Sequence, residues 1–334
     1  MKKFLTPAFV LVILLLAAAE LASRLFFPQD VSGRFEYGYS PDAGFVERPD
    51  GTVQLTRAGG RRFRPQSFAK HRPEGAFRIF VIGDSVPRGP GQKQAYPWQV
   101  VEELRRHQVP AESFNLGLAG HGSRRSQLVL KKVLEYEPSL IILHVNNSTE
   151  FEDDREYRRS QEFKSWPPKN WLMKSFIFRR LYEVKTEAVL WRLLPDAIRT
   201  RFAADDAGAK IAAFQDKKKL AEWKKQVARN TAASVNLALG KNVPVLVVSQ
   251  CRLKGDAQKR PFLDDYGLDA LGHSLEGEGV YTLSMKQVFS PVPDFPSYFA
   301  DGAHLTPPGH AILAHAIFQK IYQEHLAKKY ITQK

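Results

Sequence analysis

Two short polar segments combine residue types that could carry out nucleophilic chemistry. Gly83-Asp84-Ser85 follows the apolar run FRIFVI, which is typical of a strand buried on both faces, so a serine hydroxyl lies at the end of that strand. Far along the chain, the tetrapeptide DGAH supplies Asp301 and His304. A serine hydroxyl is a weak nucleophile at neutral pH, and it needs a base that is itself oriented by a third group. We therefore predict that His304 accepts the proton of Ser85 and that Asp301 orients the imidazole.

The elements that must position these residues alternate along the chain. Apolar runs typical of strands covered on both faces occupy residues 77–82, 113–119, 139–145, 243–250 and 279–285. Helical patterns occupy residues 97–107, 126–137 and about 213–240, and apolar residues recur at helical spacing between 312 and 321. This alternation predicts a parallel sheet built by right-handed crossovers. Ligands bind outside the carboxyl ends of such strands, so we expect the loops 83–89, 115–123 and 144–151 to converge.

Each motif is ambiguous when it is taken alone. Gly-Asp-Ser by itself is more typical of a strand-to-turn connection in which Asp84 caps a helix, and DGAH of a polar loop. Together, with Asn115 to Gly120 between them, these segments resemble the blocks of the SGNH/GDSL hydrolase superfamily. The resemblance covers roughly residues 77–325, except for an unaligned insertion.

The resemblance implies a flavodoxin-like three-layer α/β/α fold with a mainly parallel sheet. It also implies a serine that attacks an ester carbonyl, with the oxyanion held by the backbone N–H groups of Ser85 and Gly120 and by an asparagine amide. In the block that should supply this amide, the family pattern Gly-x-Asn-Asp is replaced by Val-Asn-Asn-Ser. We assign the amide to Asn147, with Asn146 as the alternative, while a gapless alignment from the strand places Ser148 there.

The N-terminus contains a membrane segment. After the sequence MKK, residues 4–27 are almost uninterruptedly apolar, and roughly 20 such residues cross a bilayer. A cleavable signal peptide has a similar composition, but the helical pattern continues to Phe27 and favours an uncleaved anchor. Lys2 and Lys3 stay on the cytoplasmic side in both cases. We predict a single-pass protein of the cell membrane with its catalytic domain on the periplasmic or extracellular side.

We divide the chain into three parts: an anchor or signal (1–27), a lead-in segment with short strands (28–75) and a hydrolase-like domain (76–330). A helical insertion interrupts this domain at about 151–242. Within it, residues 174–194 mix aromatic and basic side chains. Packing against the sheet is the favoured interpretation of that segment, and a helix lying on the membrane surface is the alternative.

Several residues near the predicted loops receive structural interpretations. We expect His121 and His144 to be hydrogen-bonded wall residues and His310 to cap or pack the last helix. The acidic run and the arginines of these loops are expected to be solvated, without a metal site; these residues are Glu150, Glu152, Asp153, Asp154, Arg88, Arg124 and Arg125. Cys251 is the single cysteine, so an intramolecular disulfide is impossible.

The net charge of +14 favours acidic neighbours such as anionic lipid headgroups or an envelope polymer. Nucleic acid is disfavoured, because no zinc-finger spacing or RNP-like aromatic motif is present. The sequence therefore predicts an exported serine esterase that cleaves acyl esters, with O-acetyl groups of envelope carbohydrate or lipid esters as substrates and no metal or organic cofactor implied. The alternatives are an O-acyltransferase that uses the same residues and a non-catalytic module that binds an anionic polymer or an envelope complex.

Overall fold

The computed structural model describes residues 7–26, 33, 36–165, 175–178, 195–197, 208–210, 212–255 and 260–331. Its centre is a five-stranded parallel sheet in the order β10-β7-β6-β4-β5. The strands are β4 (Phe77–Gly83), β5 (Ala111–Gly117), β6 (Leu140–Val145), β7 (Val245–Ser249) and β10 (Val280–Ser284). Numbered along the chain, this order is the 2-1-3-4-5 arrangement of flavodoxin-like folds. The predicted fold class is therefore confirmed.

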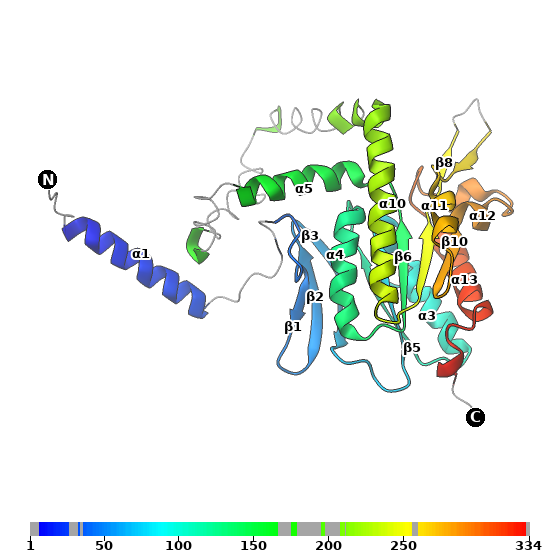
Figure 1. Ribbon diagram of the computed structural model, residues 1–334, viewed down its shortest axis with the longest axis horizontal. Coiled ribbons are helices and arrows are strands. Elements are labelled where there is room, and N and C mark those ends of the chain that lie inside the picture. The colour runs from blue at the N-terminus through cyan, green and yellow to red at the C-terminus, as the bar shows by residue number, and fades with distance from the viewer. Residues whose placement is uncertain are drawn as a thin grey trace.

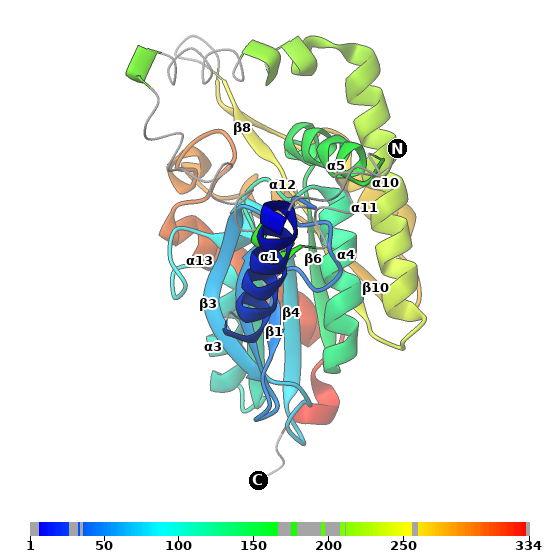
Figure 2. The same ribbon diagram turned by 90° about the vertical axis from the view of Figure 1, so that its left-hand side faces the viewer.

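Helices cover both faces of this sheet (Figure 2). One layer contains α3 (Tyr96–Arg106), α12 (Met285–Phe289) and α13 (Pro307–Gln323), and the other contains α4 (Ser123–Val133), α10 (Lys217–Leu239) and α11 (Leu268–Leu275). Every residue of β4 is buried because both faces of the strand are covered. Phe80 and Ile82 enter the hydrophobic cluster under α4, whereas Ile79 and Val81 enter the cluster under α3. This alternation explains why β4 has a continuous apolar run rather than a polar face.

The lead-in segment forms a second, antiparallel sheet that covers the edge of the first. Its strands are β1 (Phe45–Glu47), β2 (Thr52–Ala58) and β3 (Arg61–Ala69). The Phe68 ring lies 4.6 Å from the Phe114 ring and 5.3 Å from the Phe80 ring, centroid to centroid. The Gln66 amide donates to the Asn115 carbonyl (3.0 Å) and accepts from the Asn115 N–H (2.9 Å), so it pairs with the backbone of edge strand β5.

Several smaller elements surround the carboxyl end of the sheet. They are α2 (Ser85–Arg88), α5 (Glu150–Ser165), the hairpin β8 (Arg252–Lys254) with β9 (Phe262–Asp264), and the short 3₁₀ helix Phe295–Tyr298. Two other 3₁₀ helices, Leu134–Tyr136 and Lys328–Tyr330, lie at the opposite end of the sheet, where they contact the start of β4. The sequence patterns did not reveal α11, α12 or the β8–β9 hairpin, which are too short for periodicity to detect. The two interpretations of residues 174–194 fall largely outside the described residues.

Helix α1 (Pro7–Phe26) projects away from the two sheets (Figure 1). Its stretch Phe9–Phe26 has a mean hydropathy of 2.2 and no buried residues. Within the described part of the chain, it is the one helix that is long and apolar enough to cross a membrane. It is therefore a signal sequence or a single membrane anchor.

Replacing Phe68 by Ala should destabilise the protein, because Phe68 is buried where the two sheets meet. Loss of a buried phenylalanine ring costs about 3–5 kcal/mol through lost transfer energy and a cavity. Phe262→Ala is the matched control, because Phe262 is half exposed and its loss should change stability by about 0.5 kcal/mol or less. Thermal unfolding of the full chain in detergent measures the stability loss of each variant. Equal losses would show that the lead-in sheet does not pack into the hydrophobic core of the main sheet.

Candidate active site

The turn after β4 presents a half-buried Ser85 at the carboxyl edge of the sheet. Asp84 caps α2, because its carboxylate accepts a hydrogen bond from the backbone N–H of Val86 (3.0 Å). Gly83 allows the close approach that this turn requires, since a Cβ there would lie 2.8 Å from Pro87 Cγ and 2.9 Å from His144 Cβ. The strand therefore ends on a glycine for a steric reason, and the serine begins the helix.

Ser85, His304 and Asp301 form one chain of hydrogen bonds, although 219 positions separate the first two residues. His304 Nε2 lies 2.8 Å from Ser85 Oγ, and His304 Nδ1 lies 2.7 Å from Asp301 Oδ2. The second carboxylate oxygen of Asp301 accepts from the backbone N–H groups of Ala303 (2.7 Å) and His304 (2.8 Å). This is the order of nucleophile, base and orienting group that activates a serine hydroxyl.

The charge of Asp301 is stabilised by this arrangement. Partial burial raises the pKa of Asp301, but the hydrogen bonds from the His304 backbone N–H, the His304 imidazole and the Ala303 N–H outweigh it and lower the pKa below its usual value. The group facing His304 Nδ1 is thus a carboxylate at neutral pH. It fixes the tautomer that leaves Nε2 as an acceptor toward Ser85 Oγ.

Gly120 lies in the wall of the cavity next to Ser85 and has a positive φ of 71°. This left-handed backbone conformation favours glycine, and a Cβ here would also displace the Arg61 guanidinium, which lies 2.7 Å from that position. The carbonyl of Gly120 accepts a hydrogen bond from Arg125. Arg125 therefore holds the peptide unit that follows Gly120.

The structure brings Asn146, rather than Asn147, to the cavity that contains Ser85. Asn147 lines a neighbouring cavity instead. One N–H of the Asn146 amide donates to Asp84, and its oxygen accepts from the Ser148 N–H (2.9 Å). The physical reason is direction, because successive side chains at the end of an extended strand point to opposite sides. Of the two asparagines, Asn146 thus borders the cavity beside Ser85, and the choice of oxyanion donor stays a prediction.

The expectation of a solvated acidic run is wrong for Glu150 and Asp153, whose side chains are fully buried. Glu150 accepts from the backbone N–H of Ser123 (2.6 Å), and Asp153 accepts from that of Arg124 (3.3 Å). These two carboxylates satisfy N–H groups at the start of α4, where helices leave donors unpaired. Burial, together with repulsion from Asp153, raises the pKa of Glu150.

The expectation of a solvated Arg125 is also wrong. Its guanidinium is buried, and it donates to Asp153 Oδ1 (2.6 Å) and to Glu156. The Tyr39 hydroxyl donates to the same Asp153 carboxylate at 2.7 Å. Arg124 and Arg88 are only partly buried, and Arg124 pairs with Asp154 at 3.1 Å.

Three stacked rings lie beneath the nucleophile turn. The Tyr96 ring lies between His144 (5.9 Å) and His310 (6.1 Å), and the Tyr96 hydroxyl is 3.2 Å from His144 Nδ1. Burial lowers the pKa values of both histidines, and that of His310 falls to about 4 with a contribution from His144 and His304. His144 is thus a buried wall residue hydrogen-bonded to Tyr96, and His310 is a buried packing residue, as the sequence analysis expected.

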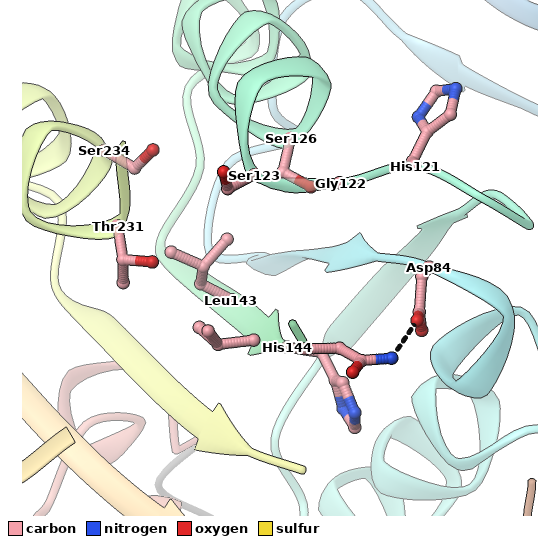
Figure 3. Close-up of a pocket in the computed structure, with 11 residues that line it drawn as sticks. Asp84, His121, Gly122, Ser123, Ser126, Leu143, His144, Thr231 and Ser234 are labelled. Atoms are coloured by element: carbon pink, nitrogen blue, oxygen red, sulfur yellow. Dashed lines mark hydrogen bonds between the residues drawn. The ribbon is translucent and has the colours of Figure 1, made fainter. Parts of the chain in front are cut away.

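A small polar chamber lies between the nucleophile turn and helices α4 and α10 (Figure 3). Its wall includes Asp84, Ser126, Thr231 and Ser234, and its volume is about 20 Å³. That size and lining suit a single water molecule rather than a substrate. The hydrogen bond between Asp84 and Asn146, dashed in Figure 3, borders the chamber.

The substrate-sized space is an open cavity of about 640 Å³, called here the active-site cavity. Ser85, Gly120, Asn146 and His304 line it. The other described residues in its wall are Arg61, Val86, Ser148, Thr149, Glu152, Lys210, Phe214, Gln215, Gln250, Arg252 and Ala303. Cys251 is not a competing nucleophile, because burial raises the pKa of its thiol to about 12.

Sequence reasoning missed the contribution of β3 to this site. Arg61 lines the cavity, the Arg64 guanidinium donates to the carbonyl of Gly89 at the end of α2, and Gln66 pairs with β5. The spacing of Arg64, Gln66 and Phe68 could have indicated this contribution, since residues two apart in a strand lie on the same face.

No family model and no curated protein matches the sequence. Among solved structures, the chain is similar to a GDSL-like lipase from Bacteroides thetaiotaomicron VPI-5482, with 14% identity over 77% of this chain and 93% of the other and a TM-score of 0.42. A family 3 carbohydrate esterase from Clostridium thermocellum has 10% sequence identity and a TM-score of 0.43, and the match covers 77% of this chain and 100% of the esterase. A catalytic mutant of an acetylxylan esterase from Geobacillus stearothermophilus has 12% sequence identity and a TM-score of 0.45, and the match covers 77% of this chain and 97% of the mutant.

The low pKa of His310 predicts a loss of stability in acid. The folded protein holds this histidine neutral down to about pH 4, whereas the unfolded chain binds the proton near its ordinary value of 6.5. Its contribution is therefore fully present above pH 6.5 and is lost as pH falls toward 4, by up to about 3 kcal/mol. His310→Gln should flatten this part of the curve of unfolding free energy against pH. A variant curve parallel to that of the parent between pH 6.5 and 4 would contradict the assignment.

Proposed function

We propose that the chain is a membrane-anchored, exported serine esterase of the SGNH type. Its substrates are acyl esters, with O-acetyl groups of cell-envelope carbohydrate as the preferred class. The observation that carries the proposal is the 2.8 Å contact between Ser85 Oγ and His304 Nε2, in which the imidazole is held by Asp301 at 2.7 Å. Helix α1 supports the location, because an uncleaved helix of this length would keep the active site near the membrane.

In the first half of the proposed reaction, Ser85 Oγ attacks the ester carbonyl carbon and its proton passes to His304 Nε2. The backbone N–H groups of Ser85 and Gly120 stabilise the resulting oxyanion, and the free N–H of the Asn146 amide is the third donor. When the tetrahedral intermediate collapses, the bond to the alcohol breaks and His304 returns the proton to the leaving oxygen. Asp301 stabilises the imidazolium that exists between these two proton transfers.

In the second half, water replaces the alcohol. His304 removes a proton from the water molecule, the hydroxide attacks the acyl-serine, and the carboxylic acid leaves as Ser85 recovers its proton. A sugar hydroxyl in the place of water would give acyl transfer by the same steps.

The lining of the active-site cavity offers hydrogen-bonding side chains for an acylated sugar, beside a surface that is apolar over much of its area. Of its described lining residues, only Val86, Phe214 and Ala303 have apolar side chains. A long acyl chain requires an extended apolar wall, whereas sugar hydroxyls require hydrogen-bonding groups. The 640 Å³ volume also lies within the range of about 300–1,000 Å³ that is usual for ligand sites.

A serine-directed fluorophosphonate should form an adduct on Ser85 of the full chain. Ser85→Ala should abolish the adduct, and His304→Ala should slow its formation by about 10⁴-fold, because the general base is lost. Intact mass spectrometry in detergent, with peptide mapping of the adduct, measures both effects. Folding of each variant is checked by thermal unfolding.

An adduct on another residue, or none on a folded parent protein, would contradict the esterase. The second outcome would instead support the non-catalytic module that binds an envelope polymer, since the fold would be retained without an activated nucleophile.

The two asparagines after β6 should behave differently. Asn146→Ala should lower kcat on a small acetyl ester by about 10²–10³-fold, as expected for loss of one oxyanion donor. Asn147→Ala is the matched control, because it makes the same change one residue further along, outside the active-site cavity. Initial rates at saturating ester distinguish them. A large loss for Asn147→Ala with a small loss for Asn146→Ala would restore the assignment made from sequence.

A further inference from the structure

A second cavity of about 610 Å³ adjoins the active-site cavity. Phe214 and Arg252 line both, so the two spaces meet at these side chains. We call the second space the basic cavity, because Lys217, Lys224, Arg252 and Lys254 stand in its wall. It lies between the start of α10 and the β8–β9 hairpin, which both rise above the carboxyl edge of the sheet (Figure 1).

The positive charge of the basic cavity is largely uncompensated. Its described lining residues include no aspartate or glutamate. Lys254 has one acidic partner, Asp264, at 3.4 Å. Within the described part of the chain, Lys217, Lys224 and Arg252 form no ion pair, and the Nε of Arg252 is buried without a hydrogen-bond partner. These cations are therefore available to a ligand.

Aromatic rings give the basic cavity a firm wall. Lys254 Nζ lies 4.5 Å and Arg252 Cζ 5.7 Å from the centroid of the Tyr266 ring. On the other side, the buried Trp223 packs edge-on against Phe214, with 5.5 Å between the ring centroids. Charged groups held on aromatic surfaces lose less conformational freedom when they bind a ligand.

We propose that the basic cavity is a subsite for an anionic sugar, in which a carboxylate or a phosphate group binds Arg252 and the neighbouring lysines. Guanidinium and ammonium groups form short, charge-assisted hydrogen bonds with both kinds of anion. Because the cavities meet, one polymer chain spans them, with its acylated residue at Ser85 and an adjacent charged residue in the basic cavity. This second statement rests on the proposed function, whereas anion binding does not.

The shape of the site favours a glycan over an anionic membrane surface. A bilayer presents its headgroups in a plane, and the cations here line a recess of 610 Å³ next to the candidate nucleophile. A single polymer strand can enter such a recess. The recess also gives a function to part of the net charge of +14, which the fold does not require.

Calorimetric titration of the full chain tests the proposal, in a non-ionic detergent without a sugar headgroup. The carboxylate probe is a galacturonic acid hexamer, the phosphate probe is a glycerol phosphate hexamer, and a neutral galactose hexamer of equal length is the reference. We expect binding of one or both anionic probes, at least tenfold tighter than that of the neutral hexamer, and weakening with added salt. The tighter of the two anionic probes identifies the source of the anion.

Lys224→Gln and Arg252→Gln should each weaken this binding about tenfold, which equals 1.4 kcal/mol. Lys241→Gln is the matched control. It removes the same charge from an exposed lysine just beyond the other end of α10, about 34 Å from the first turn of this 23-residue helix. Affinity equal to that of the parent is expected for this variant.

Two results would overturn the subsite: equal affinity for charged and neutral hexamers, or equal weakening by Lys224→Gln and Lys241→Gln. If the chain binds only vesicles that contain anionic lipid, and Lys224→Gln abolishes that binding, the basic cavity is a membrane contact and not a glycan subsite. The phosphonate adduct on Ser85 of the parent chain, measured beside hexamer binding, keeps the two proposals separate. If the anionic hexamer binds but Ser85 forms no phosphonate adduct, the subsite is supported and the esterase is contradicted. If Ser85 forms the adduct but no anionic hexamer binds, the esterase is supported and the subsite is contradicted.

Discussion

The ion pair between Arg125 and Asp153 is almost completely removed from solvent, with 1% and 0% of the two side chains exposed. A buried charge without a partner is strongly destabilising, so the surrounding segments must supply hydrogen bonds to both groups. They do so from four parts of the chain: Tyr39 of the lead-in, Gly120 after β5, the Arg124 N–H in the first turn of α4, and Glu156 of α5. The Gly120 loop therefore has one arrangement that satisfies this cluster, and that arrangement places its peptide beside Ser85.

The lead-in sheet helps to position the candidate active site, although no catalytic role is assigned to its residues. Its aromatic residue Phe68 packs under the main sheet, and Gln66 occupies the backbone groups of the edge strand. From the same strand, Arg64 fixes the end of α2, and Arg61 lies over Gly120. A short helix of four residues has little stability of its own, so these contacts and the Asp84 cap determine where Ser85 points.

Charge is distributed unevenly around the carboxyl edge of the sheet. Near α4 and α5, the acidic side chains are matched by Arg124, Arg125 and backbone N–H groups. Beyond Phe214, basic side chains face a cavity without acidic neighbours in its described wall. The first arrangement stabilises the fold, while the second leaves cationic groups exposed in a recess. If the proposed subsite binds an anionic polymer, electrostatic attraction would also guide that polymer toward the adjacent active-site cavity.

The sequence by itself determined the parallel α/β sheet and the three residues proposed as nucleophile, base and orienting group. Both outcomes depend on local features, namely apolar runs that end in polar turns, and residues whose chemistry is recognisable in segments of three or four. Tertiary structure alone decided the burial of Arg125, Glu150 and Asp153, because partners distant in the chain determine whether a charged residue is solvated. It also placed Asn146 and Asn147 in the walls of different cavities, because a shift of one residue at the end of a strand reverses the direction of a side chain.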